Sequence, residues 1–352
     1  FNAIQILVDE NVSVINLSAG TNGGLDAYTV DDLEVDKLID ATDVTFVTSA
    51  GNNGKSPAPN VSSPGKAYNA ITVGGAATKA SESGVEYLPP YWVYDSSSYL
   101  VDSFLTNKPD IVAPAQSFAF VNRDPVTDTL FIDKNRKKNE NTNEYYDEYY
   151  DGTSYAAPLV TGVVAQLHEA NTSLIGNPTA TKAVLLAGAD FDAISGNNND
   201  LWELCYAARV KSGVGFLNAE RAVRIAEEGN YQYSVYFMNA ASSRYGGRSY
   251  ICDSVYIPAN YKIRMVMTYS KPAEFDDIEE FANGNDMDLD LFYQGETWCE
   301  SSLTPYNNVE VVEYVVETAG SYTIEVYVAK LMQTSTRVLM DRTVAWCIEP
   351  VS

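Results

Sequence analysis

Histidine, basic side chains and long apolar runs are all scarce in this sequence. The chain has 352 residues but only 1 histidine, and 23 Lys and Arg stand against 47 Asp and Glu, a formal net charge of -24. Nucleic acids and anionic membranes are bound through Lys and Arg, so neither is expected as a partner. No apolar run approaches the ~18 residues that span a bilayer, and no signal peptide is recognised. This composition fits an extracellular or cell-surface protein.

Cysteine is also sparse, and its spacing argues against a metal centre. The four cysteines are far apart, without a CxxC pair or a Cys/His cluster that would indicate zinc. Three of them, Cys252, Cys299 and Cys347, fall in the C-terminal third, so one disulfide there is possible. Isolated buried thiols are the alternative. No metal ligand set and no cofactor are predicted from these residues.

The first two thirds of the sequence alternate between helical and strand patterns. Residues 30–43 repeat apolar side chains at helical spacing, with Leu33, Leu38 and Ile39 expected to point inward. Continuous apolar runs that end in small residues are typical of buried parallel strands; they occupy 12–20, 44–54, 70–77 and, more briefly, 108–115. The rhythm predicts an α/β fold, a parallel sheet with helices on both faces, and functional residues at the carboxyl ends of its strands.

The last third follows a different period. Apolar and polar residues alternate, with turns between the runs, in 261–269, 287–294, 309–317 and 321–330, and 342–350 closes the chain. This pattern predicts an antiparallel β-sandwich, jelly-roll-like in form. We place the boundary near Glu228, with domains at 1–228 and 229–352. The charged, tyrosine-rich residues 134–150 are interpreted as a solvated surface loop.

The segment DGTSYAAPLV, residues 151–160, carries the clearest chemical signal. Gly152 allows a tight approach, and Ser154 falls in the first turn of a predicted helix, where free N–H groups and the helix dipole favour negative charge. A bare GTS is more typical of a serine that caps a helix. The longer run changes the interpretation, since GTSYAAPLVTG resembles the serine motif of the subtilisin-like (S8) serine proteases, GTSxAxPxVxG.

Other segments extend this resemblance in the family's order. VINLSAG resembles the VINxSxG segment, VTSAGNNG the AAGNxG segment, KPDIVAPA the KPDIxAPG segment, and SGVGFLNAERAV the closing pattern of the catalytic domain. The resemblance implies a subtilase-type catalytic domain and hydrolysis of polypeptides by acyl transfer. It implies Ser154 as the nucleophile, and Asn52 as an oxyanion-hole donor beside the Ser154 backbone N–H.

The same resemblance implies residues that contact the substrate. Ser18, Ala19 and Gly20 would form an extended edge that hydrogen-bonds the substrate backbone. Ala50 and Gly51 would line the pocket for the side chain before the cut, and their small size suggests an open pocket for large apolar or aromatic groups.

The general base of such a site is missing. Family members carry an Asp motif and a His motif before the VINxSxG strand, and neither occurs here. The only histidine, His168, lies 14 residues beyond Ser154 on the same predicted helix, about 21 Å away at 1.5 Å per residue, too far for a base that must come within ~3 Å. Asp151 is interpreted as a turn residue.

Three explanations remain open for the missing base. The chain is the C-terminal part of a longer protease, truncated or cleaved, and an N-terminal segment of the same protein supplies the Asp and His and completes the sheet. Alternatively, it is a pseudoprotease that keeps the fold for binding, or a structural or adhesive module.

The C-terminal third resembles the prepeptidase C-terminal and P-domain-like sandwiches of secreted proteases. The resemblance rests on DLDLFY, NNVEVVEY and GSYTIEV. Asp286, Asp288 and Asp290 alternate, so they share one strand face and could bind Ca²⁺. A solvated polar face opposite a buried one is the alternative that we favour. This domain is expected to stabilise the catalytic domain or to grip a surface.

Overall fold

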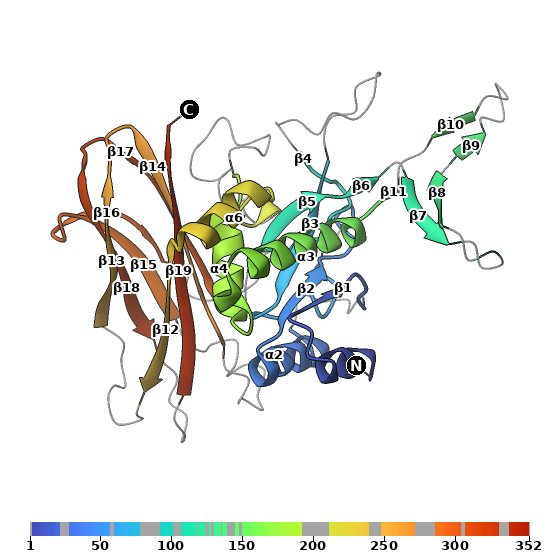
Figure 1. The fold of residues 1–352 in the computed structure, drawn as a ribbon, viewed down its shortest axis with the longest axis horizontal. Coiled ribbons are helices and arrows are strands. Elements are labelled where there is room, and N and C mark those ends of the chain that lie inside the picture. The colour runs from blue at the N-terminus through green and yellow to red at the C-terminus, as the bar shows by residue number, and fades with distance from the viewer. Residues whose placement is uncertain are drawn as a thin grey trace.

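The structure is a computed structural model that describes most of the chain. The described residues are 2–21, 28–56, 60–77, 92–100, 107–117, 119–123, 127, 130–134, 136–138, 145–147, 150–191, 211–238, 248–271, 286–303, 307–330 and 338–351. Figure 1 shows an α/β part that contains the N-terminus and a β-sandwich that contains the C-terminus.

A mixed, mainly parallel sheet forms the centre of the α/β part. The strands β1, β2, β3 and β5 run parallel, whereas the two-residue β4 pairs antiparallel with the end of β3. Every residue of β2 is buried, as its continuous apolar run predicts. The strands are β1 (Val14–Leu17), β2 (Thr45–Ser49), β3 (Ile71–Ala77), β4 (Trp92–Val93) and β5 (Ile111–Pro114).

Helices cover this sheet, and their ends match capping residues in the sequence. The side chain of Asn177 accepts from the backbone of Ala180 at the start of α4, and Gly229 ends α6 in the left-handed conformation. Within the described residues, no helix is both long enough and apolar enough to cross a membrane. The helices are α1 (Asn2–Asp9), α2 (Val30–Thr42), α3 (Thr153–Ala170), the 3-10 turn η1 (Thr172–Leu174), α4 (Pro178–Gly188) and α6 (Ala219–Glu228).

The helix α2 buries carboxylates as well as apolar side chains. Leu33 and Ile39 face inward as predicted, and Leu38 is only partly buried. Asp32 and Asp36, which carry no apolar signal, are fully buried on the same helix. Their partners include backbone N–H groups of the segment 60–69, described below.

Short strands form an arm where a loop was predicted. Residues 134–150 contain the hairpin β9–β10, in which Tyr145 pairs with Lys138, so the interpretation of this stretch as a loop was wrong. Figure 1 shows β7 to β10 extending away from the body of the molecule. The strands are β6 (Gln116–Ser117), β7 (Ala119–Arg123), β8 (Leu130–Lys134), β9 (Arg136–Lys138), β10 (Tyr145–Asp147) and β11 (Tyr150–Asp151).

Two four-stranded antiparallel sheets form the C-terminal sandwich, in the orders β12-β19-β14-β17 and β13-β18-β15-β16. Alternate side chains of β15, namely Met287, Leu289 and Leu291, are fully buried between the sheets. The strands are β12 (Tyr231–Met238), β13 (Arg248–Ile257), β14 (Tyr261–Tyr269), β15 (Asp286–Tyr293), β16 (Thr297–Ser302), β17 (Val309–Val316), β18 (Gly320–Lys330) and β19 (Val338–Pro350).

The sandwich and the α/β part share one hydrophobic core. Val266, Val309 and Ala345 of the sandwich belong to the same buried cluster as the apolar face of α4. Figure 1 shows α4 and α6 lying between the parallel sheet and the sandwich. A hydrogen bond from Thr268 Oγ1 to Thr179 O, at 2.7 Å, joins the two parts. The helix α6 ends at Glu228, next to the domain boundary that we predict from the sequence.

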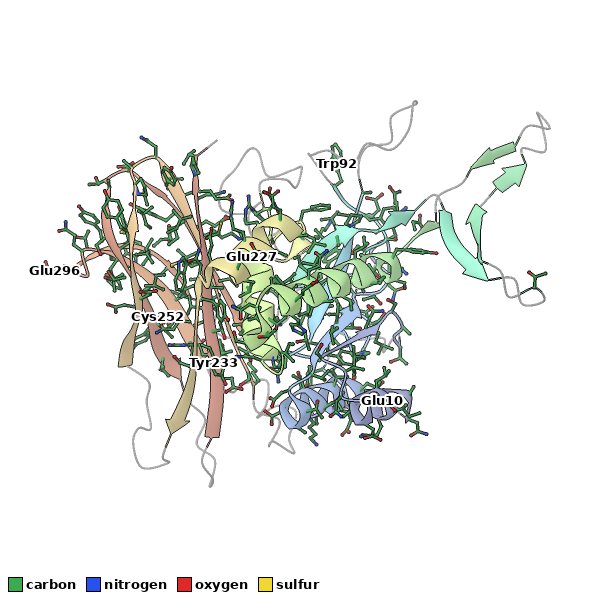
Figure 2. The ribbon with its side chains drawn as sticks, viewed as in Figure 1. Glu10, Trp92, Glu227, Tyr233, Cys252 and Glu296 are labelled. Carbon is green, nitrogen blue, oxygen red and sulfur yellow. The ribbon has the colours of Figure 1, made fainter. Side chains whose placement is uncertain are left out.

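Three of the four cysteines are free thiols. Cys252 and Cys347 are buried, and Cys299 is half-buried; Figure 2 shows Cys252 within the sandwich. No disulfide therefore joins these three residues, and isolated thiols describe them correctly. Cys205 lies outside the described residues.

Candidate active site

The N-terminus of α3 is shaped by a glycine at a crowded point. Gly152 has φ +145°, and a Cβ added there would lie 3.3 Å from Nδ2 of Asn52. Its N–H donates to Ala115 O at 2.9 Å, just beyond the end of β5. Only glycine combines this backbone conformation with so close an approach, and Ser154 therefore enters the first helical turn beside Asn52.

Asn52 closes the N-terminus of α3 from another loop. Its Oδ1 accepts from the Thr153 backbone N–H at 2.9 Å and from Thr153 Oγ1 at 3.2 Å. The Gly51 N–H in turn donates to Thr153 Oγ1 at 3.1 Å. Because a backbone N–H requires an acceptor, this contact fixes which amide atom faces the helix. The Nδ2 donor of Asn52 then lies on the other side of the amide.

Ser154 lies where the loops after β1 and β2 meet. Its Oγ donates to the Ser18 carbonyl at 3.2 Å, and the side chain is half-buried. Thr153 and Tyr155 donate their N–H groups to Asn52 Oδ1 and Gly152 O, and within the described part of the chain no acceptor faces the Ser154 N–H. The structure thus brings Ser18, Asn52 and Ser154 together at the carboxyl ends of parallel strands, where we expected a site.

The predicted substrate edge, Ser18 to Gly20, is held by a second segment. The adjoining residue Thr21 exchanges backbone hydrogen bonds with Ser63, at 2.9 and 3.1 Å. A Cβ on Gly20 would lie 2.8 Å from Ser63 O and 2.9 Å from the Ser62 Cβ. Ala19 and Gly20 themselves are exposed, so a ligand can reach the edge.

The predicted pocket residues Ala50 and Gly51 lie beside closely packed serine residues. Gly51 has φ +103°, and a Cβ there would meet Ser62 Oγ at 2.4 Å and Ser98 Oγ at 3.2 Å. Ala50 is fully buried, and its carbonyl accepts from the Ser62 N–H at 2.9 Å. Serine side chains therefore lie close beside Gly51, and the expectation of an open pocket for large apolar or aromatic groups stays a prediction.

Two residues of this site escaped the sequence reasoning. Thr153 links Gly51 to Asn52 through its hydroxyl, and its position inside GTS was the available signal. Ser62 lies between Gly20 and Gly51, 42 and 11 residues from them along the chain. Nothing local in the sequence around Ser62 indicates these contacts, because they depend on how the segment 60–69 folds back on the sheet.

Comparison with known families now identifies the chain. The model of the subtilase family, peptidase S8, matches residues 1–245. This chain belongs to the subtilase family.

The subtilase chain also resembles individual proteins. Pyrolysin from Pyrococcus furiosus is 31% identical over 198 residues, which are 50% of this chain and 13% of pyrolysin. The chain thus spans a small part of that relative's length.

Two solved proteases show a low structural similarity to this chain. The patellamide maturation protease PatA is 20% identical with a TM-score of 0.43, over 65% of this chain and 68% of PatA. The prenylagaramide maturation protease PagA is 21% identical with a TM-score of 0.42, over 63% of this chain and 65% of PagA.

Both ring nitrogens of His168 in the subtilase chain contact hydroxyl groups of neighbouring residues. It is buried near the end of α3, where its Nδ1 lies 3.2 Å from Ser13 Oγ and its Nε2 lies 3.2 Å from Thr181 Oγ1. Burial lowers the pKa of this imidazole. Its hydrogen bonds bind it to the opposite end of the helix from Ser154, in keeping with our exclusion of it as the base.

Asp151 is not the turn residue that we predicted. It belongs to the short strand β11, which pairs with Gln116 of β6, and it accepts a hydrogen bond from the Tyr94 hydroxyl. Its exposed carboxylate is thereby held on the strand that leads into Gly152.

The three alternating aspartates lie on β15, and Asp288 is the middle one. Burial, then the neighbouring Asp286 and Asp290, raises the pKa of Asp288 to about 7. Ser301 Oγ donates to Asp290. Among the described residues, no group of three or more His, Cys, Asp or Glu side chains is arranged to hold a metal ion, so calcium binding here stays a prediction.

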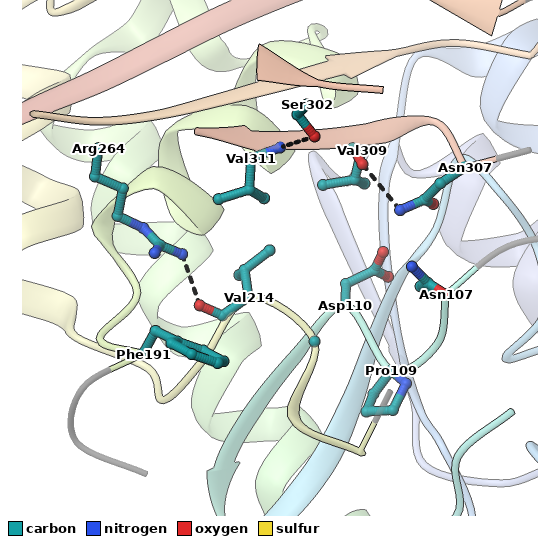
Figure 3. A pocket seen from close by; sticks show the side chains of 11 residues that line it. Asn107, Pro109, Asp110, Phe191, Val214, Arg264, Ser302, Asn307, Val309 and Val311 are labelled. Carbon is teal, nitrogen blue, oxygen red and sulfur yellow. Dashed lines mark hydrogen bonds between the residues drawn. The ribbon is translucent and has the colours of Figure 1, made fainter. Parts of the chain in front are cut away.

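A cavity of the subtilase chain lies apart from the predicted site. It is lined by residues of both parts of the molecule, including Asp110 and Val214 of the α/β part and Val309 and Val311 of the sandwich. Figure 3 shows Arg264 beside it, with its guanidinium donating to the Val214 carbonyl at 2.6 Å. None of the predicted site residues lines this cavity, and we assign it no part in the chemistry.

Proposed function

We propose that this chain carries the nucleophile and the oxyanion hole of a subtilisin-like serine endopeptidase. Ser154 Oγ attacks the carbonyl carbon of a peptide bond and passes its proton to a base. The C–N bond then breaks, the amine leaves with a proton, and the peptide stays as an ester on Ser154. Water hydrolyses that ester, which releases a carboxylic acid and restores the serine.

The observation that supports this proposal best is that the oxygen and the nitrogen of the Asn52 side-chain amide face different partners. Its oxygen is occupied by the N–H and hydroxyl of Thr153, so its nitrogen is the donor left for a ligand. Together with the Ser154 N–H, this nitrogen would face the negative oxygen that forms as the serine attacks. A serine that merely capped α3 would need no such second donor.

We assign the extended edge and the pocket to the segments that converge on Ser154. Ser18, Ala19 and Gly20 would pair with the substrate backbone, and Ala50 and Gly51 would border the side chain before the cut. The exposure of Ala19 and Gly20 supports this role. The substrate is a polypeptide in this proposal.

The Asp and His of the site would come from a segment outside residues 1–352. In the described structure β1 is an edge strand that pairs only with β2, and edge strands offer unpaired backbone groups to another strand. The neighbouring helix α1 buries no residue, and Ile6 and Leu7 are 62% and 41% exposed. We infer that an N-terminal segment of the same protein covers this edge and completes the active site.

The remaining assignments follow from this proposal. An extracellular or cell-surface location suits the acidic chain, and the sandwich would support the catalytic part through their common core. Calcium could bind at Asp286, Asp288 and Asp290, and we propose no other cofactor.

Labelling with a fluorophosphonate tests the proposal. The protein that includes the coding region before Phe1 should be labelled on Ser154, as located by mass spectrometry of the peptide. Ser154→Ala should abolish the label, and the exposed Ser173→Ala should not. Failure of the folded longer protein to label Ser154 would contradict the protease function and favour a pseudoprotease or a binding module.

A further inference from the structure

A fully buried carboxylate lies behind Ser62 and Ser63, which form the wall of the proposed pocket beside Gly51. Asp32 is 0% exposed in the first turn of α2. Its Oδ2 accepts from Ser63 Oγ at 2.9 Å and from the Thr29 N–H at 2.8 Å, and its Oδ1 accepts from the Lys66 N–H at 3.0 Å. The carboxylate is therefore hydrogen-bonded to the segment 60–69 at two residues, Ser63 and Lys66.

The hydrogen bonds of Asp32 help to position both sides of the pocket. Ser63 pairs through its backbone with Thr21, directly after the substrate edge. Ser62, the next residue along, lies between Gly20 and Gly51. A shift of Ser63 would therefore move the edge and the wall together, although Asp32 itself contacts neither a predicted substrate residue nor Ser154.

A carboxylate suits this position better than any neutral side chain. Both oxygens are acceptors, and the helix N-terminus favours a negative charge. The buried Lys66 ammonium lies 4.0 Å from Oδ2 and donates to the Val61 carbonyl at 3.3 Å, on the same segment. An asparagine has only one acceptor oxygen, so its NH₂ would face one of the present donors.

We propose that Asp32 is a positioning residue that determines which side chain the pocket accepts. The inference rests on the proposed function, because it takes residues 18–20 and 50–51 as the substrate-binding segments. Asp32 acts through Ser63, and Ser62 forms the surface that the substrate side chain meets.

The decisive measurement is a selectivity ratio. Two peptides that differ only in the residue before the cut, Ala in one and Phe in the other, are compared in kcat/KM. Asp32→Asn should shift the ratio toward Phe by about fivefold, the size expected for one lost hydrogen bond, because a loosened wall admits the larger side chain. A variant that only unfolds in part loses active protein equally for both peptides, so its ratio does not move.

Asp36 supplies a matched control on the same helix. It is also fully buried, one turn further along, but its carboxylate accepts from the N–H groups of Tyr68 and Asn69, at 2.9 and 2.7 Å, and from the Tyr28 hydroxyl at 2.5 Å, and not from Ser63. Asp36→Asn should lower the melting temperature and leave the ratio unchanged. Ser63→Ala should shift the ratio as Asp32→Asn does, and the double variant should shift it no further.

An unchanged ratio in active Asp32→Asn and Ser63→Ala proteins would overturn this inference and leave the proposed function intact. Ser154 labelling of the same preparations reports on the proposed function separately. If Ser154 is unlabelled, the ratio of the dissociation constants of the two peptides, measured by calorimetry, tests the role of Asp32 instead: a shift supports the inference and an unchanged ratio overturns it.

Discussion

The buried aspartates of the helix α2 lie beside backbone N–H groups, whereas the clustered aspartates of the strand β15 lie beside one another. Asp32 and Asp36 are four residues apart on a helix, and each reaches backbone N–H groups of the segment 60–69. Asp286, Asp288 and Asp290 are two residues apart on a strand, where burial and the like charges on one shared face raise the pKa of the middle carboxyl. Burial raises the pKa of Asp36 and of Asp288, but like charges on the same element add to the rise only at Asp288.

The amide of Asn52 belongs with the α2 carboxylates in this comparison. Like Asp32, it presents an oxygen to a backbone N–H of a distant segment. The difference is that the proposed chemistry also requires its nitrogen. Three predictions, in order of decreasing effect, test whether Asn52 differs from the buried carboxylates and whether the α2 and β15 carboxylates differ from each other.

The largest effect is expected at Asn52. In Asn52→Asp, a carboxylate oxygen still caps α3 but the Nδ2 donor is lost, so kcat should fall by about 10²–10³, the size known from subtilisins themselves, with little change in melting temperature. Asn52→Ala should lose the same activity and in addition about 1 kcal/mol of stability, the usual cost of a missing cap. Peptidase kinetics and thermal unfolding on the longer protein separate the two roles.

Full activity in Asn52→Asp would show that only the oxygen matters. Asn52 would then be a structural acceptor of the same kind as Asp32, and the oxyanion hole would have to be sought elsewhere.

A smaller effect on stability, with a distinct pH dependence, is expected at Asp36. Asp36→Asn should cost about 2 kcal/mol at pH 8, because an amide NH₂ would face a backbone N–H. Burial raises the pKa of Asp36 to about 6, above its usual 3.8. The folded native protein therefore holds a proton that the unfolded chain releases between these values, and this contribution is present at low pH and lost as the pH rises through 6.

The deficit of Asp36→Asn should accordingly be larger at pH 5 than at pH 8. Thermal unfolding of both proteins across this range measures it. A deficit that shrinks on acidification would mean that the hydrogen bonds from Tyr28, Tyr68 and Asn69 outweigh burial and hold the carboxyl ionised.

The smallest effect, of opposite sign, is expected at Asp288. Its pKa of about 7 means that stability is lost as the pH rises from 3.8 through 7. Asp288→Asn should therefore be more stable than the native protein at pH 8, by about 1 kcal/mol, the usual size of a single-substitution effect, and the gain should vanish at pH 5. Calcium added at pH 8 offers a sharper contrast. A rise in the native melting temperature that Asp288→Asn lacks would reveal a cation site.

Much of the fold was predictable from periodicity. The run 261–269 matches β14 residue for residue, and 30–43 matches α2 to within one residue, because apolar spacing is a local property. The strands β13 and β16 were missed. In β13 a register shift between Ile251 and Asp253 interrupts the alternation, and β16 contains no fully buried residue, so neither shows a clean period of two.

The site was predictable where a motif carries it and not where the chain folds back. Ser154 and Asn52 were named from short patterns, and the structure brings both to the start of α3. Ser62, Ser63 and Asp32 were not, because a buried serine or aspartate has no local signature. Their roles come from contacts between segments about 30 to 40 residues apart.

The strand β19 is the last of the described strands to be synthesised, yet it lies in the interior of its sheet. It lies between β12 and β14 in its sheet and also packs against α4. Until residues 338–350 have left the ribosome, β14 and α6 can cover the apolar side of α4 only in part, and β12 has no neighbour on that side. A product that stops short of Val338 would therefore leave part of the apolar side of α4 and one edge of β12 exposed to solvent.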